Sequence, residues 1–244
     1  MKLIKPIALF LILFCLTNNA FAEKGHLTFR PYIELSNYAY QEPSVMEKTS
    51  DKPFLGLGLT VEAPILNDLV ILDVAYKTGT TNYSSVRTGK TSADPTNISQ
   101  IEVKYVKKFD QLEVYSGIGY RALFDAWGNK VTSTNHDTYD RRSQYVYAPL
   151  GMKFNNGLLA NTMVQFNFLL HGLQTSYFGT IAGYQDTSKL QKSGWGIRTE
   201  KKINENLQIF ISYWDIEESE LNRGFYEPKN TTFETGVKLY FNRY

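Results

Sequence analysis

Residues 55–63 read Leu-Gly-Leu-Gly-Leu-Thr-Val-Glu-Ala and alternate strictly between apolar and small or polar side chains. Successive side chains of a β-strand point to opposite faces, so this stretch predicts a strand with one apolar face and one polar face. The apolar face carries Leu55, Leu57, Leu59 and Val61. The polar face carries Gly56, Gly58, Thr60 and Glu62.

Further stretches of the same kind follow one another through residues 23–244, and the connections between them are alternately long and short. The long connections are 41–53, 79–96, 125–142, 172–193 and 217–230, and the short ones are 64–68, 108–111, 155–157 and 202–206. Transmembrane barrels have short periplasmic turns and long extracellular loops. The pattern therefore predicts an all-β, antiparallel, up-and-down transmembrane β-barrel of about ten strands with both ends in the periplasm. Eight strands are the alternative if the weakest stretch, 193–201, is misread together with a neighbour.

Alternation alone does not tell whether the apolar faces point outward into lipid or inward, as in a soluble lipocalin-like barrel. Pointing inward, they would put about forty bulky side chains into a lumen that eight to ten strands fill with ordinary ones. The polar faces fit that space better, because glycines leave room and opposite charges can pair. We therefore expect an inside-out barrel surrounded by lipid. The charged residues expected in the lumen are Arg30, Glu34, Glu62, Asp73, Lys77, Glu102, Lys104, Glu113, Arg121, Lys153, Arg198, Glu200 and Glu234.

Residues 1–22 have the pattern of a secretory signal peptide, which leaves 23–244 as one barrel domain. Lys2 and Lys5 precede an apolar segment, and Ala20-Phe21-Ala22 supplies the cleavage pattern. The chain's one cysteine, Cys15, lies in that apolar segment, so residues 23–244 cannot form a disulfide or a thiolate metal site. Removing Lys2 and Lys5 from 26 basic residues leaves 24, equal to the 24 acidic ones, and this balance gives no indication of a nucleic-acid partner.

Aromatic residues gather toward both ends of the predicted strands, as in the interfacial girdles of membrane barrels. Those near the long connections are Tyr38, Tyr40, Tyr76, Phe124, Trp127, Tyr177, Phe178, Trp195 and Tyr213. Those near the short turns are Phe29, Tyr105, Phe109, Phe154 and Tyr240. Ordinary core aromatics of a β-protein are the alternative interpretation.

Several segments resemble recurrent ones in the small outer-membrane β-barrel proteins of Gram-negative bacteria, the broad class that holds opacity-type and OmpA-type barrels. They are residues 119–121 (Gly-Tyr-Arg), 139–143 (Tyr-Asp-Arg-Arg-Ser), 145–151 (Tyr-Val-Tyr-Ala-Pro-Leu-Gly) and 214–216 (Trp-Asp-Ile). The resemblance implies the cell outer membrane as location. Expected partners are outer-membrane lipid and lipopolysaccharide, with barrel-assembly machinery and periplasmic chaperones during biogenesis.

The C-terminus departs from the pattern of that class, which usually ends on an aromatic residue preceded by apolar residues at alternate positions. Tyr244 is aromatic, but Lys238 and Asn242 interrupt the apolar alternation. Phe241 is therefore the predicted last strand position.

The three histidines give little support for catalysis. A rim hydrolase would need His136 and Asp137 to face a second acidic group such as Asp215, Glu217 or Glu218. His171 is expected to face the lumen or the loop base, so no histidine is predicted on the lipid face, where a lipid-A hydrolase would need one. We expect neither an enzyme nor a metal site or cofactor; the rim hydrolase stays a remote alternative.

The densest group of tyrosine and arginine lies where the third long connection enters its strand. Its members are Tyr139, Arg141, Arg142, Tyr145 and Tyr147. Such residues often anchor binding surfaces, here for a host or envelope ligand or for lipopolysaccharide phosphates. The alternative is local pairing of the two arginines with Asp137 and Asp140.

The functional expectation is a structural or surface-interaction protein that acts through its extracellular loops, and a narrow porin-like channel for small solutes is the alternative. A lumen filled by the charged residues together with Tyr32, Tyr115 and Tyr145 would favour the first.

Overall fold

The computed structural model describes residues 26–181, 183–221 and 226–241. The predicted signal peptide, its cleavage point and Tyr244 lie outside them. Within the described residues no helix is long and apolar enough to cross a membrane. The strands are β1 (Thr28–Glu42), β2 (Met46–Ser50), β3 (Phe54–Ile65), β4 (Asp68–Ser85), β5 (Gly89–Lys108), β6 (Leu112–Asp125), β7 (Asp140–Phe154), β8 (Thr162–Tyr177), β9 (Thr187–Gln191), β10 (Gly194–Lys202), β11 (Leu207–Ile216) and β12 (Asn230–Tyr240), with one 3-10 turn, η1 (Phe178–Thr180).

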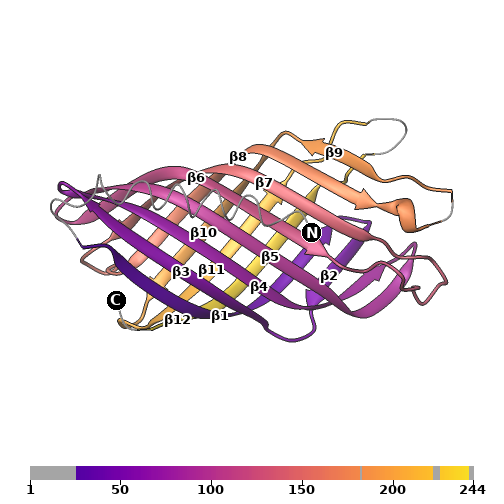
Figure 1. Ribbon diagram of the computed structural model, residues 1–244, viewed down its shortest axis with the longest axis horizontal. Helices are drawn as coiled ribbons and strands as arrows, with labels where there is room; N and C mark the ends of the chain where they lie inside the picture. Colours follow the sequence, from indigo (N-terminus) through magenta and orange to yellow (C-terminus); the bar gives the residue numbers. More distant parts are fainter. Residues whose placement is uncertain (1–25, 182, 222–225, 242–244) are drawn as a thin grey trace.

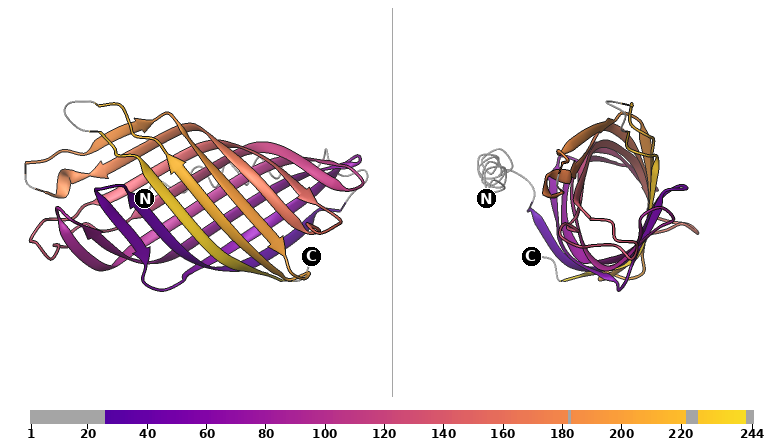
Figure 2. Two further views of the ribbon diagram at one scale, coloured as in Figure 1. Left: turned by 180° about the vertical axis from the view of Figure 1, so that it is seen from behind. Right: turned by 90° about the vertical axis from the view of Figure 1, so that its right-hand side faces the viewer.

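Ten of these strands form a closed antiparallel ring, which confirms the predicted strand number. The ring contains every strand except the short β2 and β9. Each strand of the ring pairs with the next one along the chain, and β12 pairs with β1, where Tyr240 lies opposite Tyr32. The stretch that the sequence indicated most weakly is β10, which pairs with both β8 and β11. The strands run obliquely around a long barrel (Figure 1), and the end-on view shows the closed ring (Figure 2).

The short strands β2 and β9 extend the sheet at the end of the long connections. Beyond the end of β3, β2 takes its place in the sheet and pairs with both β1 and β4. β9 pairs with the C-terminal part of β8, residues 172–176. The short turns lie at the opposite end, together with the start of β1 and the end of β12. We call the long-connection end extracellular and the short-turn end periplasmic.

The prediction of a long loop over 79–96 is wrong, because β4 and β5 remain paired almost to the turn at 86–88. Residues 80–85, Thr-Thr-Asn-Tyr-Ser-Ser, include β-branched and aromatic residues that favour strands. Apolar alternation is missing there because this hairpin extends beyond the lipid, where both faces can be polar. Gly89, at φ +84°, closes the turn in a conformation that suits glycine.

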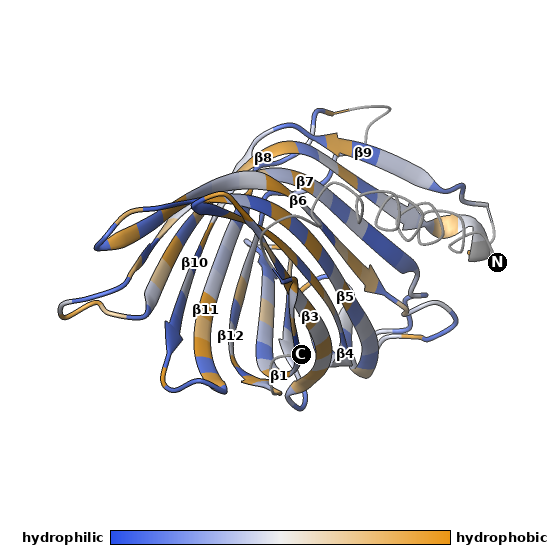
Figure 3. Cartoon of the chain, turned by 60° about the vertical axis from the view of Figure 1, so that its left-hand side comes forward, coloured by the Kyte–Doolittle hydropathy of each residue, from blue (hydrophilic) through white to orange (hydrophobic). Residues whose placement is uncertain are grey.

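The aliphatic faces point outward and the charged faces point inward, as predicted. Leu57 is 64% exposed and Ile118 is 56% exposed, whereas Glu34 is 3% exposed. Figure 3 shows hydrophobic and hydrophilic residues alternating along the strands. An exterior of this kind matches the hydrocarbon of a membrane, with every strand edge paired in the ring.

The aromatic girdles are smaller than the sequence predicted. Tyr76, Trp195 and Tyr105 do face outward, and the Trp195 ring packs 5.6 Å from that of Tyr213. The prediction is wrong for four girdle residues, which are buried inside the barrel: Tyr38, Tyr40, Trp127 and Tyr240. Three of them stand on inward-facing strand positions, and Trp127 turns inward directly after β6. Height along the strand therefore did not determine which way a ring points.

Replacement of Leu57 by arginine should destabilise the folded barrel by about 2–4 kcal/mol, because the cation would lie among lipid chains. The matched control is Val86→Arg in the β4–β5 turn, where Val86 is 91% exposed. Urea titrations of folding into lipid vesicles measure both variants. Equal stability of the two would show that the outward faces do not contact lipid.

Candidate functional site

Two separate cavities lie in the lumen that the described residues enclose, with a packed layer between them. The periplasmic cavity has a volume of about 380 Å³ and the extracellular cavity about 280 Å³. No residue lines both. The layer between them contains the buried rings of Tyr38, Phe54, Tyr145, Tyr147 and Trp214.

The periplasmic cavity collects nearly all the charged residues that the sequence assigned to the lumen. The two exceptions, Arg121 and Glu234, are buried but do not line it. Lining the cavity are Arg30, Glu34, Glu62, Asp73, Lys77, Glu102, Lys104, Glu113, Lys153, Arg198 and Glu200. Lys238 joins them, although the sequence interpretation treated it as an interruption of the apolar stripe. Lys238 lies four residues after Glu234, and residues an even number of positions apart on a strand face the same side. This spacing could have predicted that Lys238 points into the lumen.

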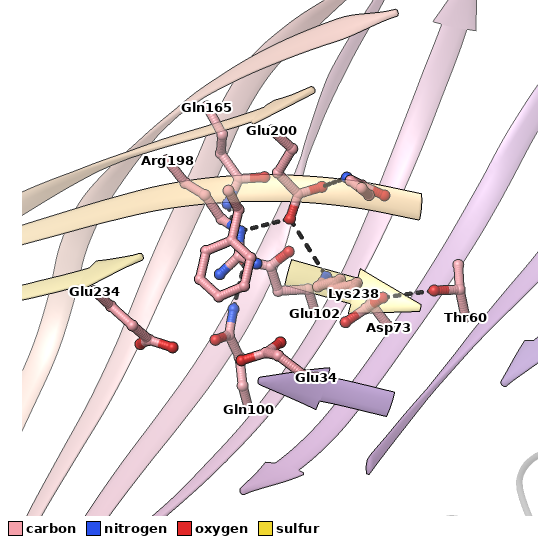
Figure 4. A network of polar contacts seen from close by, with 12 residues as sticks. Glu34, Thr60, Asp73, Gln100, Glu102, Gln165, Arg198, Glu200, Glu234 and Lys238 are labelled. Atoms are coloured by element: carbon pink, nitrogen blue, oxygen red, sulfur yellow. Dashed lines mark hydrogen bonds and ion pairs between the residues drawn. The ribbon is translucent and has the colours of Figure 1, made fainter. Parts of the chain in front are cut away.

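Ion pairs and hydrogen bonds connect these side chains across the strands (Figure 4). Glu200 accepts from Arg198 Nε at 2.7 Å and pairs with Lys238 Nζ at 3.3 Å. Glu102 pairs with Lys104 at 2.8 Å. It also accepts from the Tyr147 hydroxyl at 2.7 Å and from Gln165 Nε2 at 2.9 Å. Charges inside the barrel therefore meet partners within the barrel rather than water alone.

A second group of charges lies at the top of the periplasmic cavity. Lys77 contacts two carboxylates, Glu34 at 2.8 Å and Glu234. Arg121 lies 3.9 Å from Glu234 and 5.6 Å from the Trp214 ring centroid. Arg121 thus lies against the underside of the aromatic layer, and Glu234 connects it to Lys77.

Glycines explain how aromatic rings fit inside so narrow a barrel. Tyr32 lies directly across from Gly58, Tyr115 from Gly151, Tyr147 from Gly119 and Trp214 from Gly196. A Cβ atom at any of these glycines would overlap with the ring opposite. Phe54 occupies the space over Gly79 in the same way. The inward glycines therefore provide the space into which the lumen rings pack.

The extracellular cavity rests on a group of buried charges from four strands and one connection. Arg141 Nη1 donates to Glu42 at 2.6 Å, and Arg141 Nε donates to Asp125 at 3.3 Å. Asp125 also pairs with Lys48 at 2.6 Å. Glu227, from the segment between β11 and β12, lies 3.8 Å from Arg141. Burial raises the pKa of the Glu227 carboxyl to about 7, and nearby Glu42 adds to this while Arg141 opposes it.

Aromatic side chains form much of the wall of the extracellular cavity. Tyr83 meets Trp127 edge to face at 5.3 Å, and Tyr139 packs on Phe178 at 4.2 Å. Tyr226 is half-exposed at the opening. The Trp127 indole N–H is buried and has no hydrogen-bond partner among the described residues. The sequence interpretation placed Trp127 in the lipid girdle and did not anticipate this wall.

The structure does not bring the predicted tyrosine and arginine group into one exposed surface. Tyr139 and Arg141 line the extracellular cavity, while Tyr145 and Tyr147 point into the aromatic layer below it. Arg142 lies on the alternate, outward face of β7. The group was predicted from its closeness in sequence, but alternate residues of a strand lie on opposite faces and their depth changes along it. Arg141 pairs with carboxylates from other strands rather than with Asp137 or Asp140.

The candidate hydrolase residues are not assembled either. His136 Nδ1 lies 3.0 Å from Thr134 within its own connection, and Asp215 pairs with Lys229 at 3.0 Å. The expectation for His171 is wrong: a bulge after Val146 shifts the alternation of β8, and His171 becomes exposed opposite the outward Val146. In the described part of the chain, no group of three or more histidine, cysteine, aspartate or glutamate residues could hold a metal ion.

Replacement of Gly119 by alanine should destabilise the barrel by about 1–3 kcal/mol, because the new methyl group overlaps with the Tyr147 ring. The cost should become much smaller in a Tyr147→Ala background, where the ring is absent. Folding titrations of the two single variants and the double variant give the coupling. A coupling near zero would contradict the assigned contact.

Replacement of Lys77 by methionine should destabilise the barrel by about 3–5 kcal/mol, because Glu34 and Glu234 then face each other without their shared cation. Adding Glu34→Gln and Glu234→Gln should recover much of the loss. The same folding titration compares these variants. If the triple variant is less stable than Lys77→Met alone, carboxylate repulsion is not the cause.

Comparisons with known proteins find similar solved structures but no matching family model or curated sequence. The translocator domain of the autotransporter NalP from Neisseria meningitidis is similar over 96% of both chains, with a TM-score of 0.39 and 10% identity.

Two further solved structures are similar over most of their length. The outer membrane protease OmpT from Escherichia coli is covered to 99% by 90% of this chain, with a TM-score of 0.48 and 8% identity. The attachment invasion locus protein Ail of Yersinia pestis is covered to 100% by 89% of this chain, with a TM-score of 0.33 and 13% identity. From its closed ring of ten strands and its apolar exterior, the chain is a small outer-membrane β-barrel protein.

Proposed function

We propose that this barrel is a non-catalytic, non-conducting outer-membrane protein that interacts with ligands at its extracellular end. The observation that carries the proposal is the packed layer between the two cavities. It combines the rings of Tyr38, Tyr145, Tyr147 and Trp214 with the buried Arg121. A solute would have to displace several of these buried side chains to pass.

The extracellular end supports an interaction role because its cavity is built from separate parts of the chain. Side chains of β1, β4, β7 and β9 line it, together with residues of the connections before β7 and before β12. Buried pairs such as Arg141–Glu42 and Lys48–Asp125 join these parts across the barrel. Such a cavity, shaped in advance and open at one end, is the usual form of a binding site.

A narrow passive channel is the second candidate, and one observation favours it. The two cavities lie in the same lumen, and the periplasmic one is lined by charges of both signs. Movement of the Tyr147 and Trp214 rings, which pack edge to face at 5.0 Å, would be the step that joins the cavities.

Planar-bilayer recordings on the purified barrel distinguish the two candidates. We expect no stepwise conductance from the unaltered protein. A Tyr147→Ala, Trp214→Ala double variant should conduct, because it removes two rings of the layer, and it serves as the positive control for insertion. Well-defined conductance steps from the unaltered barrel would contradict the sealed lumen and support the channel.

A further inference from the structure

We propose that the extracellular cavity binds a small organic ammonium ion, with aromatic rings around the cation and Glu227 as its counter-ion. The inference rests on the proposed function, since it assigns a ligand class to the extracellular end. Three features support it: the aromatic walls, the charge of the cavity floor and the protonation of Glu227.

The walls provide the ring faces and edges that an organic cation prefers. Tyr83 with Trp127 forms one aromatic pair, Tyr139 with Phe178 forms another, and Tyr226 lies at the opening. A cation close to such rings is attracted by their π-electrons, and aromatic cages are the usual site for quaternary ammonium groups. A volume of about 280 Å³ accommodates a trimethylammonium group with a short polar tail.

Among the described residues, the buried charges on which the cavity rests, here called its floor, include one more negative than positive group when all are ionised. Arg141 and Lys48 supply two positive charges, while Glu42, Asp125 and Glu227 supply three negative ones. Glu42 and Asp125 have close cations, at 2.6 Å each. Glu227 lies 3.8 Å from Arg141, a guanidinium that already donates to two other carboxylates. Glu227 is therefore the carboxylate that a bound cation would neutralise.

Other charged groups face the cavity from the elements around it. Among the described residues, the charged ones that line the cavity are Glu42 of β1, Arg87 of the β4–β5 turn, Asp137 before β7, Arg141 of β7, Lys189 of β9 and Glu227. Lys48 of β2 and Asp125 of β6 pair with each other next to this lining, and Asp125 also pairs with Arg141. Arg87, Asp137 and Lys189 lie nearer to solvent than the floor residues. Water screens charges at the opening more than buried ones, so the floor determines the sign of the preferred ligand.

Protonation of Glu227 should make binding depend on pH near neutrality. Its pKa is raised from 4.5 to about 7, so the carboxyl is protonated below neutral pH and ionised above it. A cation binds more tightly to the ionised form, and its binding in turn favours loss of the proton. Affinity for a permanently charged ammonium ion should therefore increase from pH 6 to pH 8, with proton release when binding is measured near pH 7.

Choline is the probe, and its neutral isostere 3,3-dimethylbutan-1-ol is the matched control ligand. Isothermal titration of the folded barrel should show choline binding about tenfold tighter than the alcohol at pH 8. Choline affinity should fall about fivefold or more at pH 6, and titrations in buffers of different ionisation enthalpy should detect the released proton.

Two variants separate the role of Glu227 from a general effect of charge. Glu227→Gln should weaken choline binding about tenfold at pH 8 and remove both the pH dependence and the proton release. Glu220→Gln is the control, because Glu220 belongs to the same connection but is exposed and pairs with Lys192. It should bind choline like the unaltered protein. Heat-modifiable gel migration checks that each variant is folded.

Equal binding of choline and the alcohol, no binding of either, or unchanged pH dependence in Glu227→Gln would each overturn the proposed ligand class. The sealed lumen is tested separately by conductance. A barrel that neither conducts nor binds choline would retain the non-conducting character and lose the ammonium site. A barrel that conducts would lose the proposed function whatever its ligands.

Discussion

Every second residue of ten strands points into one narrow lumen, and the space there sets the conditions that the rest of the structure meets. Aromatic rings fit because a glycine stands opposite them on the neighbouring strand, as Gly119 does opposite Tyr147. Charged side chains fit because they find partners on other strands, as Lys77 does with Glu34 and Glu234. Neither kind of contact tolerates a shift of one residue in strand register, which would turn the whole inward set toward lipid. Lumen packing and strand register therefore support each other.

The same packing divides the lumen and gives its two ends different chemistry. On the periplasmic side, ion pairs such as Arg198–Glu200 surround a charged cavity. On the extracellular side, buried pairs such as Arg141–Glu42 form the floor of a cavity with aromatic walls. Buried ion pairs contribute little net stability, because desolvation offsets much of their attraction. We interpret those on the extracellular side as fixing the positions of the strands and connections that shape the cavity.

Much of this architecture could be predicted from the sequence, because alternation reports directly on which face of a strand meets lipid. The ten-stranded inside-out barrel was predicted for this reason, and it is confirmed. The functional end was harder to predict. Asp125 lies four residues after Arg121 on the same face of β6, so alternation could have placed it in the lumen, whereas Trp127 lies beyond the end of the strand, where alternation gives no direction. The β8 bulge that turns His171 outward leaves no sequence signal, since it depends on the pairing with β7. Glu42, Lys48 and Glu227 come from distant parts of the chain, and only folding brings them to one cavity floor.

The most direct test of the central claim is the accessibility of successive residues of one strand to lipid and to water. Residues 23–244 contain no cysteine, so single cysteines placed through 207–216 of β11 can each carry a nitroxide spin label. Collision rates with oxygen and with a water-soluble nickel complex are then measured on the barrel in lipid vesicles. The inside-out account predicts high oxygen and low nickel collision at Ile209 and Ile211, and low values for both reagents at Phe210 and Ser212. High nickel collision at Ile209 and Ile211, or a profile without a period of two, would contradict it.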